Sequence, residues 1–140
     1  MDGRLNSRRQ GDLGELSALG WLVEQGYCVC LPVLHSPDYD MIATRGREVL
    51  RVQVKTATHR RRDRFEVLIA TRGGNQSWSG VAKRFSPDRC DRLFVLCGDG
   101  RRWFIPADVV EGSTQLRLGG PKYAAYEVEP GRPLPTAEAA

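Results

Sequence analysis

The sequence predicts a single α+β domain, in which an N-terminal helix precedes mostly antiparallel strands. Apolar residues recur at helical spacing over residues 7–25, which predicts the helix. Residues 48–57 alternate between apolar and polar side chains, the period of a half-buried β-strand. The 140 residues are enough for one compact domain and too few for two of ordinary size.

The helix over residues 7–25 has a recognisable start and a clear apolar stripe. Ser7 followed by Gln10 fits a capping box, although an N-cap nearer Asp12 is also compatible with the sequence. The stripe consists of Leu16, Leu19, Leu22 and Val23. Glu15 lies at the end of this stripe. We expect its carboxylate to be paired, bound to a metal ion or hydrated at the helix edge, because an unpaired buried charge costs several kcal/mol.

Residues 40–57 predict a β-hairpin with a two-residue loop at 46–47. Glycine in the first central position suits a type II′ turn, because glycine accepts a positive φ. The pairs that follow from this loop are Arg45–Glu48, Thr44–Val49 and Asp40–Gln53. Directly opposed residues project to the same face with Cβ atoms about 5 Å apart, so Asp40 and Gln53 are expected to lie together.

The strand at residues 48–57 separates two kinds of side chain. One face carries Leu50, Val52 and Val54, and the other carries Arg51, Gln53 and Lys55. The second face therefore brings an amide and an ammonium group next to the Asp40 carboxylate. Such a combination suits a divalent metal and a phosphate. The candidate set is Glu15, Asp40, Gln53 and Lys55.

Oxygen ligands of this kind suit Mg²⁺. Asp40 is the expected main ligand, joined by the Gln53 side-chain oxygen and the Val54 carbonyl, and by Glu15 directly or through water. The metal would polarise a phosphodiester oxygen and lower the pKa of an attacking water. Lys55 would orient that water and stabilise the charge that builds on phosphorus.

The chain is basic, with 21 Lys and Arg against 17 Asp and Glu and a formal net charge of +4. The basic residues are clustered, which favours nucleic acid as a partner over a merely solvated surface. The expected DNA contacts are Arg51, Arg60, Arg61, Arg62, Lys83 and Arg84. Trp78 is a candidate for stacking on bases, whereas Trp103 is expected in the core.

Three motifs in this order resemble the PD-(D/E)XK nuclease superfamily: residues 11–15 (GDLGE), 37–42 (PDYDMI) and 53–55 (QVK). The QxK ending is most similar to the group I intron-associated homing endonucleases, and the archaeal Holliday junction resolvases are the next most similar group. The resemblance covers residues 8–105. It implies a restriction-endonuclease-like α/β/α core, with a mixed, largely antiparallel sheet flanked by helices.

The resemblance also implies an activity, the Mg²⁺-dependent cleavage of double-stranded DNA by a homodimer or homotetramer, with Mn²⁺ as a substitute metal. It makes Asp40 the metal-binding acid, Glu15 the helix glutamate and Lys55 the active-site lysine. Gln53 departs from the usual second acid. A Holliday junction resolvase and an inactive DNA-binding module therefore stay open as alternatives. Asp38 follows the proline as in the motif, but Asp40 fits the hairpin register and is preferred.

The rest of the chain predicts further short elements. We expect strands at residues 27–33, 65–70, 92–97, 102–105, 115–118 and 123–128, and a short helix from residue 106 to 110. The dipeptide Asp99-Gly100 predicts a type I′ turn. The domain is expected to comprise residues 1–129, followed by a loose tail over 130–140.

Neither a membrane span nor a secretory signal is expected, because no apolar run reaches roughly 18 residues and the N-terminus lacks an apolar segment. The chain is therefore expected in the cytoplasm. Its four cysteines include no C-x-x-C pair. They are expected to be reduced and buried.

Overall fold

The computed structural model describes residues 6–72, 82–83 and 85–135. It contains one α-helix, α1 (Ser7–Glu24), and a six-stranded sheet in the order β1-β2-β3-β8-β9-β11. The strands are β1 (Cys28–Cys30), β2 (Met41–Arg45), β3 (Glu48–Ala57), β8 (Arg92–Cys97), β9 (Arg102–Pro106) and β11 (Glu127–Val128). Only β3 and β8 pair in parallel. The predicted α+β class and the mixed, largely antiparallel sheet are confirmed.

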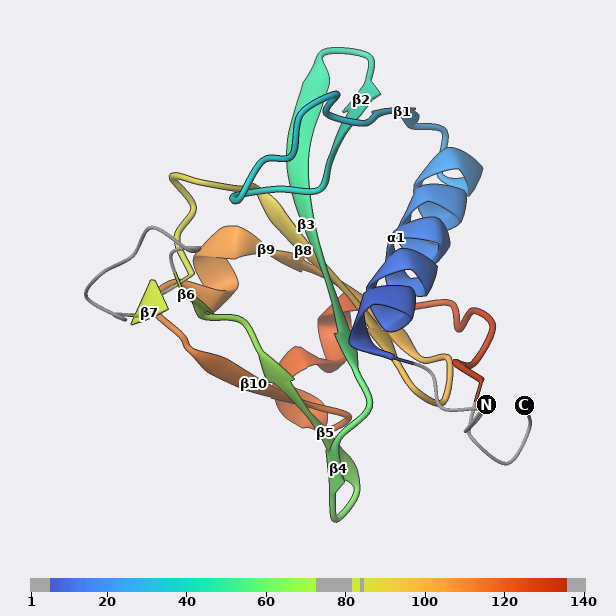
Figure 1. The fold of residues 1–140 in the computed structure, drawn as a ribbon, viewed down its shortest axis with the longest axis vertical. Coiled ribbons are helices and arrows are strands. Elements are labelled where there is room, and N and C mark those ends of the chain that lie inside the picture. Colours follow the sequence, from blue (N-terminus) through green and yellow to red (C-terminus); the bar gives the residue numbers. More distant parts are fainter. Residues whose placement is uncertain (1–5, 73–81, 84, 136–140) are drawn as a thin grey trace.

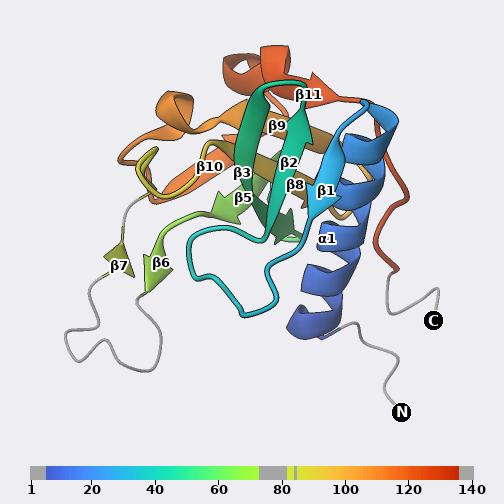
Figure 2. The same cartoon turned by 90° about the horizontal axis from the view of Figure 1, so that it is seen from above.

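The two faces of this sheet are covered differently (Figure 1; Figure 2). Helix α1 packs on one face, and a three-stranded sheet in the order β10-β5-β4 lies over the other. Its strands are β4 (Arg60–Arg61), β5 (Arg64–Leu68) and β10 (Gln115–Leu118). The remaining elements are the β6 (Thr71–Arg72) and β7 (Ala82–Lys83) pair and two 3-10 helices, η1 (Ala107–Val110) and η2 (Pro121–Tyr126).

Strand β8 separates two apolar clusters. Phe94 and Leu96 pack on the α1 side, whereas Leu93, Val95 and Cys97 pack on the side of β5 and β10. Burial on both faces explains why this strand reads as a continuous apolar run rather than an alternating one. Trp103 of β9 is fully buried, as predicted for a core residue.

The face that α1 turns to the sheet differs from the predicted leucine stripe. Leu16 is 64% exposed and Val23 is 53% exposed, so the stripe is wrong at these two positions. The buried helix residues are Gly14, Ala18, Trp21 and Leu22. The small residues let the helix axis come close to β3, where a Cβ on Gly14 would overlap the Thr56 methyl group. Close approach selects this face, and the outward leucine stays at the surface.

The N-terminal cap of α1 is Asn6, one residue before the predicted Ser7. Asn6 Oδ1 accepts a hydrogen bond from the Arg9 N–H at 2.8 Å. The side chain of an N-cap residue satisfies a backbone donor that has no partner within the helix. Asn6 has the extended backbone that this role needs, whereas Ser7 is already helical.

The two hairpin turns gave different outcomes. In the β2–β3 hairpin the loop and the register are as predicted, with Arg45 opposite Glu48 and a positive φ at Gly46. The type I′ turn predicted between β8 and β9 is wrong, because only Gly100 has a positive φ and that turn type needs two. The loop is longer, with the Gly100 N–H bonded to the Cys97 carbonyl. The Gly98 N–H continues the parallel ladder by bonding to the Ala57 carbonyl, which delays the turn.

The chain beyond β11 follows this β8–β9 loop. The Gly131 N–H donates to the Gly100 carbonyl at 2.8 Å, and the Leu134 N–H donates to the Gly98 carbonyl at 3.0 Å. Leu134 is buried in the cluster beneath α1. The segment from residue 130 to 135 is therefore held in place by main-chain bonds and one apolar anchor rather than being loose.

All four cysteines are free, but they differ in burial. Cys90 and Cys97 are buried, and burial raises the pKa of each thiol to about 12. Cys28 and Cys30 are exposed, so the expectation of burial is wrong for this pair. They lie on β1, a three-residue strand at the edge of the sheet. No described helix is long and apolar enough to cross a membrane.

Candidate active site

Asp40 lies where β2 separates from β3. The regular pairing ends at Met41 opposite Val52, one residue after Asp40. The Asp40 N–H donates to the Val52 carbonyl at 2.8 Å, and its carboxylate oxygen Oδ2 accepts from the Val54 N–H at 2.7 Å. These two bonds hold Asp40 on either side of Gln53. The carboxylate thus takes a main-chain donor that a continuing β2 would otherwise occupy.

Glu15 reaches the same place from α1. Its carboxylate and that of Asp40 interact, and both line one open pocket at the mouth of the β1–β2 connection. Partial burial raises the pKa of Glu15, and the negative charges of Asp40 and Asp12 raise the pKa further. His35 on the rim acts in the opposite direction. Two carboxylates that disfavour each other's charge create a site that favours a cation.

Gln53 and Lys55 lie on the opposite side of β3 from α1. Val54 and Thr56 are the β3 residues that face Gly14 of the helix, and side chains alternate along a strand. Gln53 is 8% exposed, and Lys55 is half-buried. Among the described residues, the Lys55 ammonium makes no hydrogen bond or ion pair within the protein.

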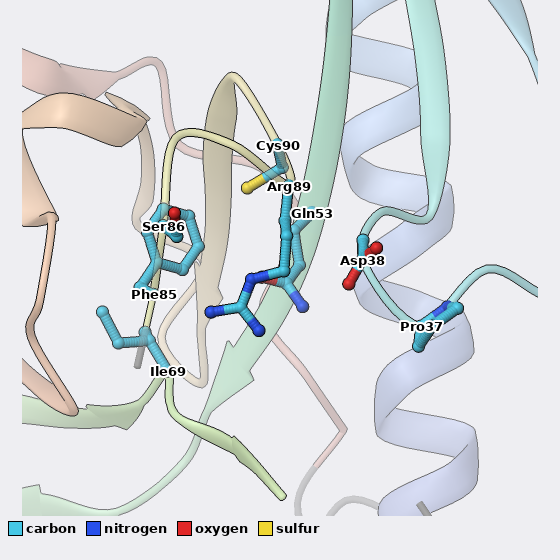
Figure 3. Close-up of a pocket in the computed structure, with 8 residues that line it drawn as sticks. All are labelled: Pro37, Asp38, Gln53, Ile69, Phe85, Ser86, Arg89 and Cys90. Carbon is cyan, nitrogen blue, oxygen red and sulfur yellow. The ribbon is translucent and has the colours of Figure 1, made fainter. Parts of the chain in front are cut away.

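A second, smaller pocket lies on the Gln53 side (Figure 3). It is lined by Pro37, Asp38, Gln53, Ile69, Phe85, Ser86, Arg89 and Cys90. The two aspartates of the PDYD motif therefore lie in different pockets, Asp38 with Gln53 and Asp40 with Glu15. The main chain of β3 separates the two, and the Val54 N–H on Asp40 connects them.

The donor set fits a divalent cation with hard-oxygen preference. Two interacting carboxylates, Glu15 and Asp40, supply negative charge, and the Gln53 amide supplies a neutral oxygen donor nearby. Within the ranges that the structure describes, no group of three or more His, Cys, Asp and Glu residues is placed to hold a metal. Further oxygen ligands would therefore come from an amide, the main chain or water, as expected when residue 53 is Gln rather than an acid.

Arg51 has partners that its sequence position did not indicate. Its Nε donates to Asp91 Oδ2 at 3.0 Å and its Nη2 to Asp91 Oδ1 at 3.2 Å. Two further N–H groups donate to the carbonyls of Pro87 and Asp88. Hydrogen bonding to Asp91 raises the pKa of Arg51, and the same contact lowers the pKa of Asp91. Four of the five guanidinium donors are thus used within the protein, which leaves little for the expected phosphate contact.

The basic segment after β3 is exposed. Arg60 and Arg61 form β4, and Arg62 follows in the turn with a φ of 59°. Arg60 also lies over the Phe65 ring and 4.0 Å from Asp99. Lys83 lies on β7, and the expected contact at Arg84 and the stacking candidate Trp78 lie outside the described residues.

The sequence reasoning missed Asp91 and the Asp38 pocket. Asp91 is 40 positions from Arg51, and no local pattern links them. The run at residues 31–34 was interpreted as the end of a strand. In the structure it is an exposed loop on the rim of the Glu15–Asp40 pocket.

Comparisons with known proteins bear on this site. A sequence model of the family described as PD-(D/E)XK endonuclease matches residues 5–128. The chain belongs to the PD-(D/E)XK endonuclease family. The predicted resemblance is therefore confirmed. The solved structure of a bacterial homing endonuclease, I-Ssp6803I, is similar in fold, with a TM-score of 0.68 at 17% identity. The match covers 87% of this chain and 86% of that one.

No curated protein sequence matches the chain. The PD-(D/E)XK assignment therefore rests on the family match, and the structural similarity supports the fold alone. The αβββ order of α1, β1, β2 and β3 carries the candidate residues Glu15, Asp40 and Gln53 of this endonuclease-family domain.

Proposed function

We propose that this PD-(D/E)XK chain is a metal-dependent DNA endonuclease that hydrolyses phosphodiester bonds. The active site we propose consists of Glu15, Asp40, Gln53 and Lys55. The observation that carries the proposal is the pairing of Glu15 with Asp40 in one pocket, with Asp40 fixed by the main chain beside Gln53. Nothing about protein stability requires two interacting carboxylates at the point where two strands separate.

Each residue has a role that follows from its chemistry. Asp40 keeps its carboxylate at a fixed position, because two main-chain bonds orient it. Glu15 adds a second carboxylate, and Gln53 adds a neutral oxygen. When bound, Mg²⁺ would polarise the scissile phosphodiester and make an attacking water more acidic. Lys55 orients that water and stabilises negative charge on the phosphoryl group, for which its ammonium has no competing partner among the described side chains.

The further proposal is double-strand cleavage of the homing type by a homodimer or homotetramer. One chain carries one candidate site, and two cuts in a duplex call for two sites. Light scattering of the protein on duplex DNA tests it, since a monomer at every concentration would contradict cooperative cleavage of both strands.

Gln53 favours a second candidate, a DNA-binding module without catalytic activity. A neutral amide replaces the negative charge that the family's usual second acid supplies, and this weakens the attraction for a cation. Such a module would bind DNA and never nick it.

Plasmid nicking separates the two candidates. The wild-type protein, Lys55→Ala and Lys122→Ala are compared with Mg²⁺, with Mn²⁺ and with EDTA. Lys122 is an exposed lysine on η2 and serves as the matched control. Metal-dependent nicking that Lys55→Ala abolishes and Lys122→Ala retains supports the endonuclease. Binding without nicking by any variant supports the inactive module.

The two aspartates are compared in the same assay. We expect Asp40→Asn to abolish nicking, because the amide carries no charge and Asp40 is the residue paired with Glu15. Asp38→Asn should retain it, since Asp38 lies in the other pocket. The reverse result would place the metal on the Asp38 side of β3.

A further inference from the structure

The rim of the Glu15–Asp40 pocket carries an unusual stretch of exposed apolar side chains. Leu31 is 60% exposed, Val33 is 98% exposed and Leu34 is 83% exposed. The connection between β1 and β2 that contains them projects past the ends of both strands (Figure 2). A run of large aliphatic side chains without protein neighbours is uncommon at a protein surface unless the run binds something.

The loop is part of the pocket rather than merely near it. Leu31, Pro32 and Val33 line the same cavity as Glu15 and Asp40. A second protein copy seated on these residues would cover the pocket and exclude its substrate. Under the proposed function, the phosphate that enters the pocket belongs to a duplex much wider than the pocket. The nucleotides beside that phosphate therefore meet this loop.

The chemistry of the loop restricts which part of DNA it can contact. Val33 and Leu34 have no donor for a phosphate and no charge, so they add nothing to the electrostatic part of binding. The largest apolar surfaces of DNA are the faces of its bases, which become accessible only where a base step is unstacked. Proteins reach them with rigid aliphatic wedges of Leu, Ile, Met, Phe or Pro.

The backbone of the loop suits such a wedge. Pro32 precedes the most exposed residue, Val33, and Pro37 follows three positions after Leu34. Each proline fixes its own φ and restricts the residue before it, so the segment has fewer conformations to lose on binding.

We propose that Val33 and Leu34 form an apolar wedge that unstacks a base step beside the phosphate held at Glu15 and Asp40. This inference rests on the proposed endonuclease function and adds a mode of substrate recognition to it. It makes DNA deformability, rather than base-edge hydrogen bonds, a determinant of where this site acts.

Fluorescence anisotropy with two probes tests the wedge. One probe is a labelled linear duplex of arbitrary sequence, and the other is the same duplex with a central mismatch, both measured with Ca²⁺ in place of Mg²⁺. The wild-type protein should bind the mismatched duplex about tenfold more tightly, the ratio that corresponds to one stacking step already lost. The double variant Val33→Ser/Leu34→Ser should bind both duplexes equally, with the same salt dependence as wild type.

Val23→Ser is the matched control, because Val23 is an exposed aliphatic residue on the outer side of α1. It should keep the mismatch preference. Serine at exposed positions leaves the core unchanged, so loss of the preference in the double variant cannot come from unfolding. Circular dichroism of each variant verifies this.

Three outcomes would overturn the wedge. A wild-type protein that nicks plasmid but binds both duplexes equally refutes the wedge and leaves the endonuclease standing. A mismatch preference that survives in the double variant assigns it to other residues. A change of oligomeric state in the double variant, seen by light scattering, makes the loop a protein interface. A wild-type protein that binds neither duplex refutes the wedge together with the proposed function.

Discussion

Gly14 is the position where α1 comes closest to β3, and its replacement by Ala tests how the site is built. A Cβ at this position would overlap Thr56 Cγ2 and lie 3.5 Å from Val54 Cγ1. Thr56 is β-branched, so its side chain has few alternative rotamers with which to move away. The helix would have to move outward, and it would carry the neighbouring Glu15 with it.

The magnitude follows from two opposing effects. Gly→Ala inside a helix stabilises by about 1 kcal/mol, because alanine loses less backbone entropy on folding. Overpacking a close contact costs about 1–3 kcal/mol, and the overlap with a stiff side chain favours the upper part of that range. We therefore expect Gly14→Ala to lower the free energy of unfolding by about 1–2 kcal/mol.

The same helix offers two matched controls. A Cβ on Gly11 or on Gly20 meets no atom within 4 Å. Gly11→Ala and Gly20→Ala should each raise the free energy of unfolding by about 0.5–1 kcal/mol. Thr56→Ser removes the methyl group in question. In that background Gly14→Ala should lose most of its cost, which a double-mutant cycle measures.

Urea unfolding followed by far-ultraviolet circular dichroism gives these free energies, and plasmid nicking gives the effect on the site. Gly14→Ala should reduce nicking more than its loss of stability explains, because Glu15 is displaced from Asp40. If Gly14→Ala stabilises the protein as the two controls do, the close helix–strand contact does not exist. The argument for the helix face then fails.

Three further predictions concern charge. Glu15→Gln should stabilise the metal-free protein above pH 4.5, the ordinary pKa of this carboxyl, and the gain should grow as pH rises through the raised folded-state pKa; parallel pH profiles of urea unfolding for both proteins would contradict this. Asp91→Asn should lower the free energy of unfolding at neutral pH by about 1–2 kcal/mol, after allowance for solvent screening of a partly exposed pair. In wild type this stability is lost as pH falls below 3.8 through the lowered pKa of Asp91, and an Asn variant as stable as wild type at pH 7 would refute the role of the Arg51 pair. Alanine at three exposed arginines should reduce the slope of log affinity against log salt by about 0.9 for each lost phosphate contact, and an unchanged slope would remove this loop from the DNA interface. Those arginines are Arg60, Arg61 and Arg62.

The hairpin that carries Asp40 was predictable because its determinants are local. The glycine at position 46 sets the loop, the loop sets the register, and the alternation of β3 sets the faces. The position of Asp40 beside Gln53 follows from these three facts alone. Glu15 was placed by the helix pattern and by the family resemblance together.

The features that sequence reasoning missed depend on contacts between distant segments. The buried face of α1 is chosen by how closely Gly14 and Ala18 let the helix approach β3, and a hydrophobicity pattern contains no such information. The β8–β9 turn is lengthened because the Gly98 N–H is taken by β3. In the same way, Arg51 finds its partner at the start of β8.

The main-chain bonds on Asp40 have a consequence for how this site tolerates change. Because backbone groups of Val52 and Val54 fix the acid, its position is independent of the side chain at residue 53. The chain can exchange an amide for a carboxylate there and alter the charge of the site without rebuilding its geometry. Residue 53 is thus an adjustable setting on a fixed frame, and Gln53→Glu is the substitution with which metal affinity can be tuned.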